Sequence, residues 1–162
     1  MIATAYSHAD TQPTTPHPNR RMTNAERDAW IDEYRNLGGI NSFELEVVYL
    51  LNEIRLERGL QPLGICPDLS MASRLMSQLM FEHHQGGRTY HQDPFYGSPW
   101  DRTLFFNPAI TAIENLSWQS TPSSVIESFM NSPGHRNSML SSSRSYIGIG
   151  FLPRSAAIMK LD

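Results

Sequence analysis

Residues 131–137 read Asn131-Ser132-Pro133-Gly134-His135-Arg136-Asn137, a stretch that combines a proline, a glycine and a histidine. A proline disfavours a helical residue before it, so a helix that reaches Ser132 should stop there. Gly134 then favours a tight turn. His135 would leave this turn held by backbone rather than by a flexible tether. An imidazole in such a position is suited to bind a metal or to move a proton.

Two earlier segments carry similar chemistry. Glu114 and Asn115 lie inside a strand-like apolar run, and His91 follows Tyr90. A carboxylate in an apolar strand is costly to bury without partners, and pairing with an imidazole would satisfy both groups. The alternative is that Glu114 and Asn115 only hydrogen-bond the loops together, and periodicity alone favours neither reading decisively.

Composition sets the broad class. The 162 residues fit one domain, and 40% apolar with 18% charged residues is typical of a globular chain. A net charge of -3 gives no basic footprint, so no nucleic-acid partner is expected. Cys66 is the only cysteine, which excludes an intrachain disulfide, and we expect it to pack as a small apolar residue. No apolar run is long enough for a transmembrane segment, and no signal peptide is visible at the start.

Capping signals divide the first half of the chain. Residues 1–22 are rich in Pro and Thr and are predicted to form a disordered tail. A capping box at Thr23 and Glu26 predicts a helix within residues 23–40 that packs on the domain. The domain itself is expected over 41–162. It should begin with a helix capped by Asn41 and continue with a helix from about Pro67, which frays at His83-His84 and ends at Gly86-Gly87.

The second half is predicted to be loop-rich at first and then to alternate. A short helix capped by Ser98 is followed by a strand over residues 109–118 and a helix from Pro122. Two late strands at 146–151 and 156–161 should be joined by a turn near Pro153-Arg154. Helices first and strands late indicate an α+β fold with an antiparallel sheet covered by helices.

These segments, in this order and spacing, resemble the CAP superfamily (cysteine-rich secretory, antigen 5 and pathogenesis-related 1 proteins) in its bacterial SCP-like form. The resemblance runs from about Phe43 to Phe151. It rests on five motifs: Leu51-Asn52-Glu53-Ile54-Arg55 with Gly59-Leu60-Gln61-Pro62-Leu63, Tyr90-His91, Glu114-Asn115-Leu116, Ser132-Pro133-Gly134-His135-Arg136 and Ile147-Gly148-Ile149-Gly150. It implies an α-β-α sandwich with a central antiparallel sheet of three to four strands flanked by helices.

The resemblance also implies a cleft lined by two His and two Glu. His91 matches the first His, with His83 or His84 as a less suited substitute, and Glu114 and His135 match the first Glu and the second His. In many relatives the second Glu follows a Trp by three positions; here Phe129 and Ser132 stand at those two places, so the second Glu is missing. Glu127 lies a helical turn or more too early. An incomplete tetrad weakens any acid–base mechanism that needs two carboxylates.

In such a site a divalent metal, often Zn²⁺, is expected on His91 and His135. Binding by two imidazoles, with water in the remaining positions, should be weak and pH-sensitive. Glu114 would orient a ligand or act as a general base on metal-bound water. Ligand contacts are expected from the five residues His91, Glu114, Asn115, Ser132 and His135.

Three functions follow from these expectations. The first is a ligand-binding or envelope interaction module without established catalysis, located extracellularly or at the cell surface by resemblance. Its partner would be a small amphipathic ligand, a peptide or a cell-wall component. The second is a zinc-assisted peptide or ester hydrolase that uses catalytic His91, His135 and Glu114. The third, a Ser132–His135 hydrolase, lacks an orienting group and an oxyanion hole.

Overall fold

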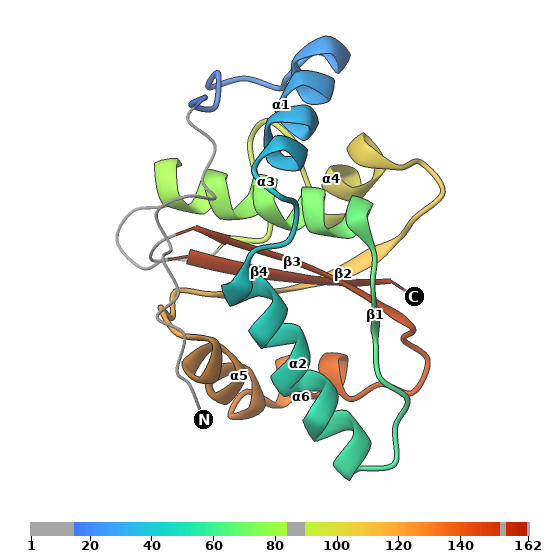
Figure 1. Ribbon diagram of the computed structural model, residues 1–162. Helices are drawn as coiled ribbons and strands as arrows, with labels where there is room; N and C mark the ends of the chain where they lie inside the picture. Colours follow the sequence, from blue (N-terminus) through green and yellow to red (C-terminus); the bar gives the residue numbers. More distant parts are fainter. Residues whose placement is uncertain (1–14, 84–89, 153–154, 162) are drawn as a thin grey trace.

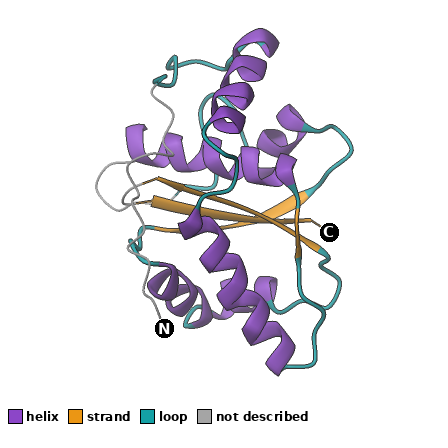
Figure 2. Cartoon of the chain, viewed as in Figure 1, coloured by secondary structure: helices purple, strands orange, loops and turns teal. Residues whose placement is uncertain are grey.

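Helices cover both faces of one sheet in the computed structural model of the chain, which describes residues 15–83, 90–152 and 155–161, the last as backbone (Figure 1). Helices α3 (Pro67–His83) and α4 (Pro99–Phe106) cover one face, with α1 (Asn24–Asn36) outside them. Helices α2 (Ser42–Glu57), α5 (Pro122–Met130) and α6 (Pro133–Met139) cover the other. The prediction of an α+β fold is confirmed (Figure 2).

The sheet has four strands in the order β1-β3-β4-β2. Strand β4 (Ser155–Leu161) pairs antiparallel with both β2 (Ala112–Ser117) and β3 (Tyr146–Leu152). The expectation of a purely antiparallel sheet needs correction at one edge, where β1 (Gly64–Ile65) pairs in parallel with β3. Because β1 has only two residues, it shows no alternation of apolar and polar side chains from which a strand could be predicted. The predicted turn at Pro153-Arg154 lies outside the described residues.

Helix starts agree closely with the capping signals. Thr23 and Asn41 each accept the amide of the Glu three residues later, whose side chain accepts the cap amide in return. Ser98 caps α4 in the same way through Asp101. The predicted stop of α3 at Gly86-Gly87 lies outside the described residues.

One helix was not predicted. His135 was expected to leave a tight turn, but residues 133–139 form the short helix α6, with His135 in its first turn. Pro133 follows the end of α5 and is the first residue of α6. A proline is favoured there because an amide at the first helical position has no partner within the helix, and because the φ of proline is already helical.

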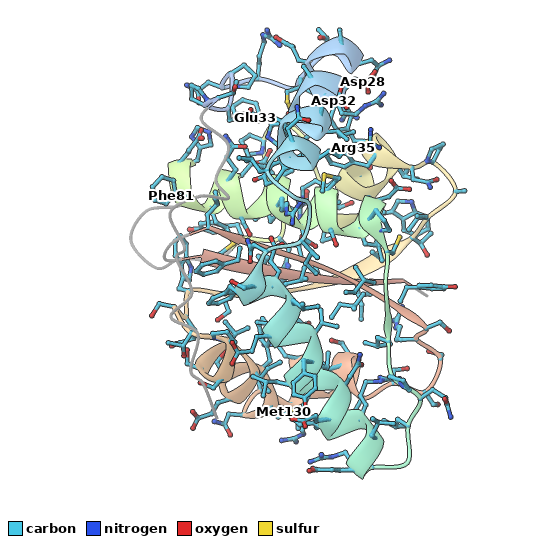
Figure 3. All side chains as sticks on the ribbon, viewed as in Figure 1. Asp28, Asp32, Glu33, Arg35, Phe81 and Met130 are labelled. Atoms are coloured by element: carbon cyan, nitrogen blue, oxygen red, sulfur yellow. The ribbon has the colours of Figure 1, made fainter. Side chains whose placement is uncertain are left out.

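Residues 15–22 differ from the predicted disordered tail. His17 and Met22 are buried, and the Met22 amide donates to the Tyr96 hydroxyl at 3.0 Å. The composition of this stretch is dominated by polar residues and proline, so it gave no sign that His17 and Met22 would be buried. Residues 1–14 lie outside the described residues. Helix α1 packs on α3, where the Trp30 indole donates to Gln78 at 2.9 Å, and its outer face carries charged side chains such as Asp28 and Asp32 (Figure 3).

Helix α3 lies directly on β3 because two glycines leave room for its backbone. A Cβ on Gly148 would lie 2.1 Å from the carbonyl carbon of Leu69, and one on Gly150 would lie 2.2 Å from the amide nitrogen of Arg74. Any side chain there would push the helix away from the sheet. The buried carboxylate of Glu44 then joins the two helical layers, since it accepts from the Arg74 guanidinium and from the Phe151 amide.

Candidate functional site

Strand β2 is one of the two edge strands of the sheet, and its residues point alternately to the two faces. Glu114 is bonded to Arg102 in α4 and to His91 in the segment before α4. Its neighbour Asn115 is bonded to Ser138 and to His135 in α6. One dipeptide therefore connects the two helical layers, because it contacts the His91 ring on one side and the His135 backbone on the other.

The carboxylate of Glu114 is held by a buried arginine. Arg102 Nη2 donates to both of its oxygens at 2.6 and 2.8 Å, and both side chains have an exposed fraction of 0%. The other terminal nitrogen of Arg102 donates to the carbonyls of His91 and Gly97. The guanidinium therefore fixes the carboxylate and the His91 backbone together.

His91 Nδ1 lies 3.1 Å from Glu114 Oε1. A carboxylate that is paired with arginine can only accept here, so this bond assigns the proton to Nδ1. The Nε2 lone pair is then left for a ligand or metal. The His91 side chain is 49% exposed, so this nitrogen is accessible from solvent.

Asn115 fixes the first turn of α6. Its Nδ2 donates to the His135 carbonyl at 3.4 Å, and its Oδ1 accepts from Ser138 Oγ at 2.9 Å. Ser138 Oγ also lies 2.9 Å from the same carbonyl. Asn115 is thus placed to position His135, and a direct contact of Asn115 with ligand remains a prediction.

The ring of His135 packs edge-on against Phe129, with centroids 5.1 Å apart and planes at 74°. Burial lowers the pKa of His135 below its ordinary value, and repulsion from the His91 imidazole, when that ring is protonated, lowers it further. The neutral imidazole, which is the form that binds metals, is therefore favoured at His135. By the family resemblance, Phe129 stands at the place of the Trp that precedes the second Glu, and Ser132 at the place of that Glu. The contact with Phe129 makes this side of the His135 imidazole apolar.

In the part of the chain that the structure describes, Glu127 and Ser132, which the sequence analysis also considered, make no contact that would support a role in proton transfer. Glu127 is exposed on α5, while its neighbour Ser128 faces β2, with its Oγ 3.3 Å from Ser117 Oγ. Ser132 is the N-cap residue of α6 and makes no side-chain capping bond. Among the described residues, no hydrogen bond joins Ser132 to the His135 ring, so the structure gives no support to a Ser132 nucleophile.

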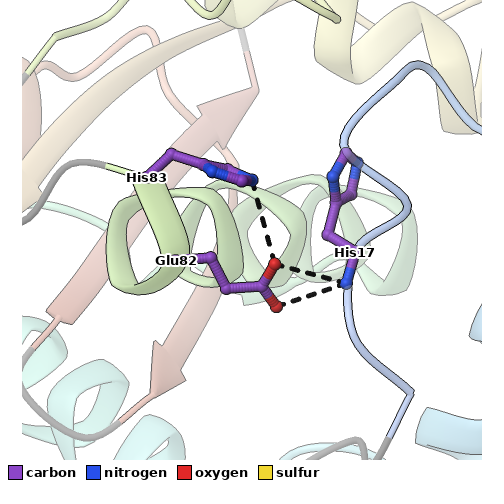
Figure 4. A group of neighbouring side chains, drawn as sticks. All are labelled: His17, Glu82 and His83. Carbon is purple, nitrogen blue, oxygen red and sulfur yellow. Dashed lines mark hydrogen bonds and ion pairs between the residues drawn. The ribbon is translucent and has the colours of Figure 1, made fainter.

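A second cluster was missed by the sequence analysis. His17, Glu82 and His83 each offer one ligand atom within 4.8 Å of the others (Figure 4). Within residues 15–83, 90–152 and 155–161, no other group of three potential metal ligands has its ligand atoms this close together. The ligand atoms of His91, Glu114 and His135 therefore do not all lie within 4.8 Å of one another. His17 was assigned to the tail, and a contact across 65 residues leaves no local signal. His84 lies outside the described residues.

Helices cover both faces of one sheet, and His91, Glu114 and His135 lie in or contact its edge strand β2, an arrangement that can be compared with known families. Residues 48–157 match the model of the CAP, or cysteine-rich secretory protein, family. The chain therefore belongs to this family, in its bacterial SCP-like form.

Similar proteins support the same assignment. The chain is 38% identical over 115 residues to YkwD of Bacillus subtilis (strain 168), a match that covers 70% of this chain and 44% of YkwD. An extracellular protein containing an SCP domain from Bacillus anthracis superposes with a TM-score of 0.69 at 20% identity, over 86% of this chain and 44% of that one. An outer surface protein from Borrelia burgdorferi gives 0.64 at 17% identity, over 72% of this chain and 89% of that one. The chain thus spans less than half of YkwD and of the Bacillus anthracis protein. None of the helices within the described residues is long and apolar enough to cross a membrane.

Proposed function

We propose that this chain is a ligand-binding module that acts outside the cell or at its surface, and that His91 and His135 hold a divalent metal at its ligand site. The observation that carries the proposal is the Arg102–Glu114–His91 chain of hydrogen bonds. A metal-bound His commonly donates its other ring N–H to a carboxylate, and this is the arrangement at His91.

The same contacts favour binding over hydrolysis. A general base needs a free lone pair within reach of a water. The carboxylate of Glu114 has an exposed fraction of 0%, accepts two bonds from Arg102 and accepts a third from His91. It is better suited to orient His91 than to take up a proton. The zinc-assisted hydrolase remains the alternative that the experiment below tests.

Two imidazoles leave coordination positions for a ligand. Catalytic zinc sites usually supply three protein ligands, so an ion on His91 and His135 would bind weakly and keep positions open to donor atoms of a peptide or cell-wall component. Tyr90, beside His91 in the sequence, is 49% exposed, and Trp100 at the start of α4 is 53% exposed. These exposed rings come from the segments that carry His91 and Arg102, and where they border the metal site they would suit a ligand with one apolar and one polar face.

The supporting argument for location is the naming of similar proteins as extracellular or as an outer surface protein. The test is a calorimetric titration of the purified chain with Zn²⁺, repeated with H91A, H135A and E114Q. We expect H91A and H135A to remove one equivalent of zinc, and E114Q to weaken it by about 10- to 100-fold. Wild-type protein without saturable uptake below millimolar zinc would remove the basis of both proposals for this site. Zinc binding combined with cleavage in a peptide and ester panel would favour the hydrolase.

A further inference from the structure

The N-terminal segment meets the end of α3 at a cluster of three potential metal ligands. Glu82 and His83 are the last two residues of α3, and His17 comes from the segment before α1 (Figure 4). The His17 amide donates to both Glu82 oxygens at 3.3 Å, and His83 Nε2 lies 3.8 Å from Glu82 Oε2. Residues that are far apart in sequence are thus already in contact without any ion.

The donor set matches that of known zinc sites. Two imidazoles and one carboxylate are a recurring three-residue combination for Zn²⁺. A tetrahedral ion with bonds of about 2.1 Å needs ligand atoms about 3.4 Å apart. The three atoms lie within 4.8 Å of one another, so they have only a short distance to close. The carboxyl end of α3 also favours a cation, because the helix dipole is negative there.

The two imidazoles are held in place by aromatic packing. The Phe95 ring stacks on His17 at a centroid distance of 5.6 Å and meets His83 edge-on at 6.0 Å. His17 and His83 are themselves in edge-on contact at 5.8 Å. Both rings are therefore oriented before any metal arrives, which lowers the entropy that binding would lose.

His17 also has a partner that can orient it as a metal ligand. Its Nδ1 accepts the Asn19 amide at 3.2 Å, which places the proton on Nε2, 2.9 Å from the Tyr96 hydroxyl. Coordination through Nδ1 replaces only the local bond to Asn19 and keeps the bond to Tyr96. Burial raises the pKa of Tyr96 to about 12, so this hydroxyl stays neutral and can accept.

We propose that His17, Glu82 and His83 form a second divalent-metal site, which fastens residues 15–22 to the end of α3. The site is independent of the His91–His135 pair, because the two share no residue. A bound ion would add coordinate bonds between residues 15–22 and α3. It would do so where the His17 amide already donates to Glu82 and the His17 ring already contacts Tyr96. Metal occupancy would then control how firmly this segment is attached.

The experiment is a Zn²⁺ titration of the full chain with two readouts, calorimetric stoichiometry and trypsin cleavage at the exposed Arg20 and Arg21. We expect H83A and E82Q each to lose one equivalent and to lose the zinc-dependent protection of these arginines. Glu82→Gln can still accept the His17 amide, and His83 is partly exposed, so both variants should fold. E57Q is the matched control, since Glu57 is an exposed glutamate at the end of α2.

His135→Ala separates this site from the proposed function. This variant should keep zinc-dependent protection at Arg20 and Arg21 even where it loses its own equivalent. The second site is overturned if H83A and E82Q take up as much zinc as wild type, or if zinc leaves the cleavage rate unchanged. If His91 and His135 bind no metal, H83A should still bind one equivalent of zinc less than wild type.

Discussion

Arg102 donates from a single guanidinium nitrogen to both carboxylate oxygens of Glu114, and neither side chain is exposed to solvent. The pair joins α4 to the edge strand β2, so it stabilises the fold and also positions the site. Its charges compensate each other, and a second lone pair of Glu114 Oε1 is directed to His91. Any change to one partner should therefore affect both stability and the orientation of His91.

Replacing Arg102 alone tests the first part. R102M leaves a buried carboxylate without its cation, and breaking a buried pair in this way costs about 3–5 kcal/mol. The free energy of unfolding, measured by urea denaturation, should fall by that amount. The double variant R102M/E114M has no orphan charge and should lose much less. A double variant as unstable as R102M would show that packing rather than charge is the origin of the loss.

Stability should also depend on pH in a definite direction. Burial lowers the pKa of both His17 and His135 below the ordinary 6.5, so the unfolded chain binds more protons than the folded one in that window. The free energy of unfolding should therefore be highest above pH 6.5 and fall as the pH drops through the folded-state pKa values. Each imidazole contributes a slope of at most about 1.4 kcal/mol per pH unit.

The measurement is a series of urea midpoints between pH 5 and pH 8. H17N and H135N should each flatten the slope below pH 6.5, and a variant of the exposed Glu57 should not. A wild-type midpoint that rises as the pH falls would contradict the assigned direction of both shifts.

The sequence predicted local features better than distant ones. The caps of α1, α2 and α4 were found because a cap and its partner are three residues apart. Strand β1 and the contact of His17 with Glu82 were missed because they depend on residues 82 and 65 positions away. Glu114 and His91 were selected through their chemistry and the family resemblance. Arg102, the group that fixes them, had no motif of its own and was recognised only from its burial and its bonds.

Glycine spacing in β3 gives a further prediction. A Cβ on Gly150 would lie 2.2 Å from a backbone nitrogen of α3, whereas one on Gly134 in α6 would meet nothing within 4 Å. G150A should therefore destabilise the chain by about 1–3 kcal/mol or more through overpacking. G134A should be neutral or stabilising by up to about 1 kcal/mol, because alanine is the better helix former. Equal melting temperatures for the two variants would mean that α3 can move away from the sheet at little cost.

Asn115 provides the most direct test of how α6 presents His135. Its amide bridges the His135 carbonyl and the Ser138 hydroxyl, so N115A removes two part-buried hydrogen bonds of about 0.5–1.5 kcal/mol each and should cost about 1–3 kcal/mol. The same variant should weaken zinc binding at His135 by about tenfold, since partners behind a ligand usually contribute at that level. S138A removes one of these contacts and should show the same two effects at smaller size. If N115A lowers stability but leaves zinc affinity unchanged, then Phe129 packing rather than the strand orients the imidazole, and the role given to Asn115 is wrong.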